Sequence, residues 1–196
     1  MPADDAERWR AFIAVALPQG VQDALAEPLR DLQPLSTWIR PNVADRIHLT
    51  LHFLGNIDPG VKDELVDQIR PIAAGTHPFS LAIEGVGAFP QVKRPKVLWA
   101  GVKGSGLSDL IRLQREIGSE LARMGYTVEP GFTPHLTLGR VRNPLRREGR
   151  QAFDAWYRRW QSTTFGEFTV DGVHLMRSQL GGGPPRYTTL ATFALQ

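Results

Sequence analysis

The sequence predicts an α+β fold built from two similar halves packed face to face. Three observations lead to this prediction. After a first strand, the order helix, strand, helix, strand, strand is expected twice along the chain. In both copies the central strand contains the tetrapeptide His-Leu-Thr-Leu, at residues 48–51 and 135–138. No linker separates the copies, so we expect a single domain of two lobes over residues 1–196.

The expected strands are rich in apolar and β-branched residues, and turn residues bound several of them. The segment before Pro18 predicts a buried strand, and the alternating segment around the first tetrapeptide closes at Gly55. The flexible loop 181–185 joins the last two strands. The strands are expected at residues 9–17, 47–54, 79–88, 95–102, 132–141, 164–177 and 186–195.

Helices are predicted from apolar residues at helical spacing and from start signals. Asp58-Pro59 and Asn143-Pro144 each place a capping residue before a proline, which favours a helix start. Pro28 lies inside the first predicted helix, so we expect a break or kink there. The helices are expected at residues 18–33, 58–74, from Ser105 or Ser108 to Gly125, and 143–160.

Composition excludes several classes of protein. Hydrophobic residues make up 42% of the 196 residues and charged residues 22%, which is typical of a soluble globular chain and argues against disorder. No apolar run approaches the roughly 20 residues of a membrane helix. The acidic N-terminal segment argues against a secretory signal. The absence of cysteine excludes disulfides, cysteine zinc sites and thiol nucleophiles, so we expect a cytoplasmic protein.

The two His-x-Thr motifs are the candidate catalytic groups. Because side chains alternate along a strand, His48 and Thr50 share one face and the motif leucines lie on the other. His135 and Thr137 are arranged in the same way. Two such strands brought together would place two imidazoles and two hydroxyls around one cleft.

This set of groups suits phosphoryl chemistry. Near neutral pH one imidazole can be neutral and accept a proton from water, while the other is protonated and donates to a leaving oxygen. The threonine hydroxyls can hold phosphate oxygens, and a nearby arginine would neutralise developing charge. The net charge of +3 is compatible with an anionic ligand but does not by itself indicate a nucleic-acid binder.

Two other interpretations of the motifs compete with this one. A single histidine on a strand more often has a structural role, but the matched pair favours catalysis. A two-histidine metal site lacks supporting carboxylates, because the nearest acids, Asp45 and Glu129, have no recognised ligand spacing. We therefore expect no metal and no cofactor. ATP is not an evident ligand, since no Gly-rich phosphate loop is present.

The other histidines are expected to have structural roles. Alternation places His52 on the same strand face as His48 and Thr50, where it would reach the rim of the cleft, but packing is favoured. His77 and His174 lack the following threonine, and we expect surface or packing roles for both.

A basic segment with aromatic residues lies between residues 140 and 159, which contain seven arginines. Such a run can track an RNA backbone. An amphipathic helix with Trp156 and Trp160 turned inward is the favoured interpretation of the aromatics, and the role of the arginine face stays open. Trp38, just before the first motif, is likewise expected to pack in the core.

The chain resembles the two-histidine (2H) phosphoesterase superfamily, whose signature is a pair of His-x-Thr motifs. Within it, the chain is most similar to the RNA 2′,3′-cyclic phosphodiesterases, also described as the 2′-5′ RNA ligase family. The similarity covers nearly the whole chain. The segments that carry it are 10–18, 46–55, 96–102, 133–140 and the stretch from Ser178 to Tyr187.

The resemblance implies two antiparallel-sheet lobes with approximate two-fold symmetry, helices on their outer faces and an active cleft between them. It implies metal-independent opening of a terminal 2′,3′-cyclic phosphate of an RNA or nucleotide, leaving a 2′-phosphate. His48 would be the general acid for the 3′-oxygen, and His135 would activate water. Thr50 and Thr137 would hold phosphate oxygens. The near symmetry of the motifs also permits the opposite assignment of acid and base.

Arg140 matches an arginine that the family carries after its second motif, where it resembles a phosphate ligand. Strict alternation puts Arg140 on the strand face opposite His135. A bulge or strand end at Gly139 would relieve this conflict. A solvated edge arginine is the equally weighted alternative.

Three functions are therefore compared. The leading hypothesis is hydrolysis of RNA 2′,3′-cyclic phosphate ends. The second is 2′-5′ RNA joining, which the same groups would catalyse in reverse. The third is a non-catalytic module that binds RNA ends, which would not need two proton carriers. In each case we expect a monomer that acts on RNA or a nucleotide and has no membrane association.

Overall fold

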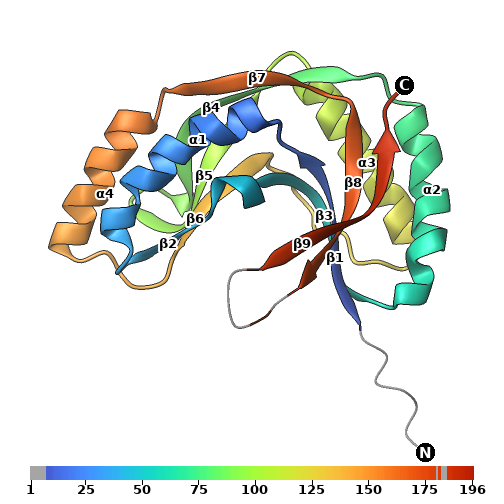
Figure 1. Ribbon diagram of the computed structural model, residues 1–196, viewed down its shortest axis with the longest axis horizontal. Helices are drawn as coiled ribbons and strands as arrows, with labels where there is room; N and C mark the ends of the chain where they lie inside the picture. The colour runs from blue at the N-terminus through green and yellow to red at the C-terminus, as the bar shows by residue number, and fades with distance from the viewer. Residues whose placement is uncertain (1–7, 180, 182–184) are drawn as a thin grey trace, which may run out of the picture.

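The computed structural model describes residues 8–179, 181 and 185–196 of the chain, and Figure 1 shows their arrangement. The loop expected at 181–185 lies largely outside the described residues. The helices are α1 (Gln19–Asp31), α2 (Lys62–Ala74), α3 (Leu107–Arg123) and α4 (Arg147–Trp160), with 3-10 turns η1 (Gln33–Leu35), η2 (Ala44–Arg46) and η3 (Pro59–Val61). The strands are β1 (Trp9–Ala16), β2 (Ile39–Pro41), β3 (His48–Ile57), β4 (Phe79–Gln91), β5 (Arg94–Lys103), β6 (His135–Val141), β7 (Thr164–Val170), β8 (Gly172–Gln179) and β9 (Arg186–Ala194).

The strands form two antiparallel sheets, which confirms the predicted two-lobed α+β fold. One sheet has four strands in the order β3-β1-β8-β9, and the other has five in the order β2-β6-β5-β4-β7. The four-stranded sheet takes strands from both ends of the chain. The lobes therefore do not coincide with the two repeated halves of the sequence. The two motif strands, β3 and β6, fall in different sheets.

The helices pack around the sheets: α1 and α4 contact strands of the five-stranded sheet, α2 contacts the four-stranded sheet, and α3 contacts a strand of each (Figure 1). Each helix buries an apolar face against the sheets or against a neighbouring helix, as α3 does with Leu110, Ile117 and Leu121. The strand leucines that alternate with the motif residues, such as Leu49 and Leu136, are fully buried. Within the described residues, no helix has the length and apolar character needed to cross a membrane.

The break expected at Pro28 is wrong, because α1 continues through this residue to Asp31. A proline removes one helical hydrogen bond. Leu25 and Leu29, on either side of it, are buried, and packing of an apolar face supplies most of a helix's stability in a protein. The carbonyl of Pro28 also accepts a hydrogen bond of 2.9 Å from the Trp156 indole of α4.

Three local expectations also change in the structure. The strand expected over 164–177 is two strands, β7 and β8, and each belongs to a different sheet. Asn143 does not cap α4, which begins at Arg147; its side chain donates to the Thr37 carbonyl instead. The short strand β2 was not predicted, and it pairs with β6 so that Arg40 lies opposite Arg140.

Candidate active site

A cleft of about 610 Å³ is lined by residues from both sheets. Within the described residues, β3 and β6 lie close to each other where the two sheets meet. The structure brings all five predicted site residues to this cleft. They are His48, Thr50, His135, Thr137 and Arg140.

The His48 ring is held on three sides. Its Nδ1 lies 2.9 Å from the Arg46 carbonyl, which can only accept, so Nδ1 carries the proton and donates. Phe12 of β1 stacks on the ring with centroids 4.6 Å apart, and Tyr187 of β9 meets it edge-on at 5.0 Å. Burial lowers the pKa of His48, and the hydrogen bond to Arg46 raises it by a smaller amount.

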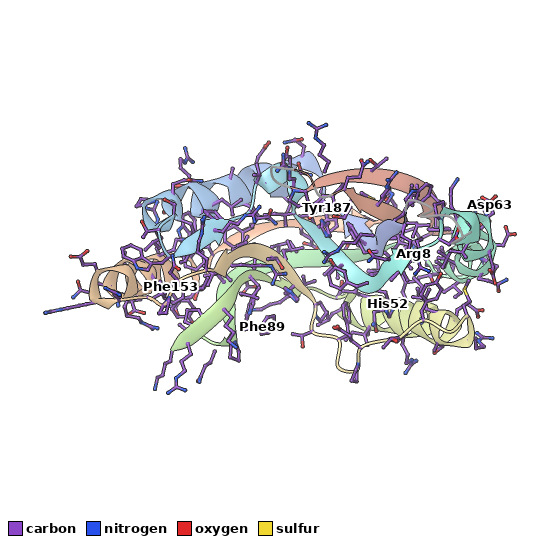
Figure 2. The ribbon with its side chains drawn as sticks, turned by 90° about the horizontal axis from the view of Figure 1, so that it is seen from below. Arg8, His52, Asp63, Phe89, Phe153 and Tyr187 are labelled. Carbon is purple, nitrogen blue, oxygen red and sulfur yellow. The ribbon has the colours of Figure 1, made fainter. Side chains whose placement is uncertain are left out.

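The His135 ring is held in a matching way. Its Nδ1 donates to the Thr133 carbonyl at 2.8 Å, two residues back, as in the first motif. Phe89 of β4 contacts the ring edge-on, with centroids 5.0 Å apart. Figure 2 shows that Phe89 and Tyr187 come from opposite lobes. In both motifs Nε2 is thus the nitrogen that can exchange a proton with a ligand in the cleft.

A β-bulge turns Arg140 toward the cleft. Trp99 of β5 pairs with Thr137 and the next residue, Leu98, pairs with Gly139, so Leu138 is an extra residue in β6. Arg140 then pairs with Val97, which lies on the same face of β5 as Trp99. The bulge therefore brings Arg140 onto the face of Thr137. Strict alternation failed here because β6 contains this irregularity one residue before the expected glycine.

A second bulge has the opposite effect on His52. On β3, Thr50 pairs with Ala14 of β1 and His52 pairs with Ile13, which leaves Leu51 as the extra residue. His52 is therefore on the strand face opposite His48, and the expectation that they share a face is wrong, although His52 still lines the cleft. The ring is buried, and its Nε2 donates to the Gln114 carbonyl of α3 at 2.7 Å. Figure 2 places His52 beside α3, where it packs as expected.

The other candidates outside the motifs lie where packing was expected. Trp156 and Trp160 are buried, and both indoles donate to α1 residues. A Cβ on Gly149 would come within 2.7 Å of the Trp38 ring, so Trp38 packs on α4. His77 bonds the Gln196 carbonyl and His174 the Thr192 hydroxyl, away from the cleft.

Several cleft residues were missed by the sequence reasoning. Arg10 and Arg46 line the cleft beside Tyr187. Arg10 and Phe12 are two residues apart on β1 and therefore share a strand face. This spacing could have been recognised in the sequence. Arg46 precedes the first motif by two residues, and only the fold shows where its side chain lies. The cleft is strongly basic, because Glu129 is the acidic residue among its described lining.

The donor set in the cleft is that of a proton-transfer and anion-binding site. Within the described residues, no three His, Cys, Asp or Glu side chains form a group that could hold a metal ion. Two imidazoles, two hydroxyls and several guanidinium groups are suited instead to a phosphate-bearing ligand.

The chain belongs to the 2′-5′ RNA ligase superfamily, whose family model matches residues 21–182. A protein of Methanothermobacter thermautotrophicus named RNA 2′,3′-cyclic phosphodiesterase is 32% identical over 95% of this chain and 98% of its own length. A protein of Aquifex aeolicus with the same name is 30% identical over 95% of this chain and 97% of its own.

Solved structures show the same fold. A protein of Thermus thermophilus superposes with a TM-score of 0.78 at 28% identity, covering 95% of this chain and 97% of its own. E. coli LigT in complex with 3′-AMP superposes with a TM-score of 0.76 at 26% identity, covering 96% and 99%. The family and the relatives thus agree with the class expected from the paired motifs.

Proposed function

We propose that this protein hydrolyses RNA 2′,3′-cyclic phosphate ends to 2′-phosphates without a metal ion. One observation carries the proposal: two imidazoles from different sheets line one cleft, each with Nδ1 bound to a backbone carbonyl two residues back. Relatives named RNA 2′,3′-cyclic phosphodiesterase support the substrate.

The reaction follows from the roles of these groups. His135 accepts a proton from water through Nε2 as the water oxygen attacks phosphorus. The bond between phosphorus and the 3′-oxygen breaks, and His48 donates a proton from Nε2 to that oxygen. Thr50 and Thr137 hold the non-bridging oxygens, and Arg140 balances the charge that builds up on them. The product keeps its phosphate on the 2′-oxygen.

The hydrogen bonds from Nδ1 to the backbone carbonyls contribute to this chemistry by fixing the tautomer of each histidine. With Nδ1 donating to the backbone, a neutral ring has its lone pair on Nε2 and a protonated ring has a proton there. Each imidazole thereby presents the correct atom for either role without reorienting. Phe12 stacks on the His48 ring, and Phe89 meets the His135 ring edge-on.

The test is a product assay with adenosine 2′,3′-cyclic phosphate in the presence of EDTA. We expect adenosine 2′-phosphate, identified by chromatography against both isomers. Activity lost with EDTA and restored by Zn²⁺ would contradict the metal-free reaction. RNA binding without turnover would favour the end-binding module, and 2′-5′-linked products from a cyclic phosphate end and a 5′-hydroxyl end would favour the ligase.

Variants connect this activity to the cleft. We expect His48→Ala and His135→Ala each to lower kcat by about 10²–10⁴-fold, the usual contribution of general acid–base catalysis. His77→Ala is the matched control, because His77 lies outside the cleft. A small effect of either motif substitution would remove that histidine from the acid–base pair.

We also propose that the protein acts as a cytoplasmic monomer. The proposed catalytic groups all come from one chain, so no second copy is needed to complete the cleft. The absence of cysteine agrees with a reducing compartment. Light scattering coupled to size exclusion is expected to give the mass of one chain, and a stable dimer would contradict this part of the proposal.

A further inference from the structure

The cleft holds more positive charge than a cyclic phosphate requires. A 2′,3′-cyclic phosphate carries one negative charge, and the proposed reaction meets it with Arg140, two hydroxyls and an imidazolium. Arg10 and Arg46 also line the cleft and have no role in that chemistry. Placing several cations together is unfavourable unless an anion binds among them.

Arg46 has a buried nitrogen without a partner. Its Nη1 is inaccessible to solvent and makes no hydrogen bond to the described residues. Its contact with Asp45 is a loose one at 3.9 Å, and the Asp45 side chain is 70% exposed, so this pair neutralises little of the charge. The Arg46 side chain as a whole is 29% exposed and lines the cleft, so its guanidinium charge can be met by a phosphate bound there.

A row of polar side chains crosses three strands of the four-stranded sheet. Arg10 of β1 pairs with Ser178 of β8, and Ser178 pairs with Tyr187 of β9. All three line the cleft. Burial raises the pKa of the Tyr187 hydroxyl, and the charges of Arg46, Arg10 and Arg140 oppose this shift. The hydroxyl therefore stays a neutral donor among guanidinium groups.

This row adjoins the candidate catalytic centre. The Tyr187 ring contacts the His48 ring at 5.0 Å and the Phe12 ring at 5.4 Å. Tyr187 thus contacts the proposed catalytic histidine and lines the same cleft as Arg10 and Arg46. In RNA with a 2′,3′-cyclic end, the 2′- and 3′-oxygens of the terminal ribose are both bound to the cyclic phosphate. Its neighbouring phosphate is therefore attached to the 5′-oxygen.

We propose that Arg46 and Arg10, beside Tyr187, form a second anion subsite that binds the 5′-phosphate of the terminal nucleotide. This inference rests on the proposed function and specifies its substrate class. The preferred substrate is an RNA strand or a 5′-phosphorylated nucleotide, rather than a nucleoside cyclic phosphate without a 5′-phosphate.

The test compares kcat/KM for adenosine 2′,3′-cyclic phosphate with and without a 5′-phosphate. For the wild-type protein we expect about a tenfold preference for the 5′-phosphorylated substrate, a modest value for one charge-assisted contact. Arg46→Met and Arg10→Met are each expected to bring the ratio of the two constants close to one. Arg46→Lys, which keeps the charge but loses the paired hydrogen bonds, should give an intermediate ratio.

The ratio of kcat/KM for the two substrates distinguishes a binding subsite from a purely structural role of Arg46 and Arg10. Arg70→Met, on the exposed face of α2 and outside the cleft, is the control and should keep the wild-type preference. Equal losses on both substrates in Arg46→Met and Arg10→Met, with unchanged unfolding temperatures, would overturn the subsite. So would a wild-type protein that shows no preference. A protein that turns over neither substrate would instead overturn the proposed function and, with it, this inference.

Discussion

The side chains of His48 and His135 differ in their surroundings although their motifs are identical. His48 is stacked on Phe12 and covered by Tyr187, and burial lowers its pKa. In the free protein this favours the neutral imidazole at neutral pH. For His48 to act as the acid, the anionic phosphate of the bound substrate must raise that pKa again. The surroundings of the His48 ring therefore make its role as general acid dependent on the bound phosphate.

The pH dependence of a variant tests this assignment. In His135→Ala the remaining turnover depends on His48 alone. If His48 is the acid, residual kcat falls as pH rises through the pKa of His48 in the substrate complex, because the protonated form is lost. The measurement is residual kcat between about pH 5 and about pH 9. Turnover that rises with pH over this range would show that His48 is the base and that the two roles are exchanged.

At the scale of elements, two one-residue bulges set which strand faces carry Arg140 and His52. The bulge in β6 brings Arg140 to the cleft, and the bulge in β3 moves His52 away from the face of His48 and against α3. The buried His52 then connects β3 to α3 through the Gln114 carbonyl. The packing of α3 on the motif strand therefore depends on the space around this ring.

Gly118 of α3 supplies that space. A Cβ on Gly118 would lie 2.8 Å from His52 Cε1, and the hydrogen bond to Gln114 keeps the ring from moving aside. Replacing a helical glycine by alanine normally stabilises by about 0.5–1 kcal/mol. Here we expect Gly118→Ala to lower the free energy of unfolding by about 1–2 kcal/mol, because overpacking outweighs that gain.

Urea denaturation measures the effect of this substitution. The matched control is Gly20→Ala in α1, since a Cβ at Gly20 would meet no atom within 4 Å. Gly20→Ala is expected to leave stability unchanged or raise it by about 0.5 kcal/mol. If Gly118→Ala stabilised the protein as well, the close packing of His52 on α3 would be incorrect.

At the scale of the whole molecule, buried histidines couple stability to pH. Burial lowers the pKa values of His48, His52 and His174 below the usual value of 6.5. Below that pH the unfolded chain binds protons at these positions more readily than the folded chain does. The free energy of unfolding therefore falls as pH decreases from 6.5 toward the lowered pKa values, and it is fully retained above 6.5.

Chemical denaturation at a series of pH values checks this expectation. His52→Gln removes one titrating group while keeping a donor near the Gln114 carbonyl. It should reduce the slope of unfolding free energy against pH by up to about 1.4 kcal/mol per pH unit, the contribution of one proton. Because strands from both ends of the chain share one sheet, we expect a single cooperative transition. An unchanged slope in His52→Gln would contradict the buried neutral state of this ring.

The sequence by itself determined the class of fold and the pair of histidines. Apolar spacing and turn residues are local signals, and a tetrapeptide that occurs twice is visible without coordinates. Hence most strands and helices, the inward-facing tryptophans of α4 and the paired motifs could be predicted. Helix α1 was different, because packing of Leu25 and Leu29 outweighed the local signal of Pro28.

Only the tertiary structure decided which side chains meet. Alternation along a strand is a rule of period two, and one extra residue reverses it for every position that follows. Sequence spacing therefore misplaced His52 and left Arg140 undecided. Arg10, Arg46 and Tyr187 come together through strand pairing between the two ends of the chain, which no local pattern encodes. The charge of the cleft is for this reason a property of the fold, although each arginine is visible in the sequence.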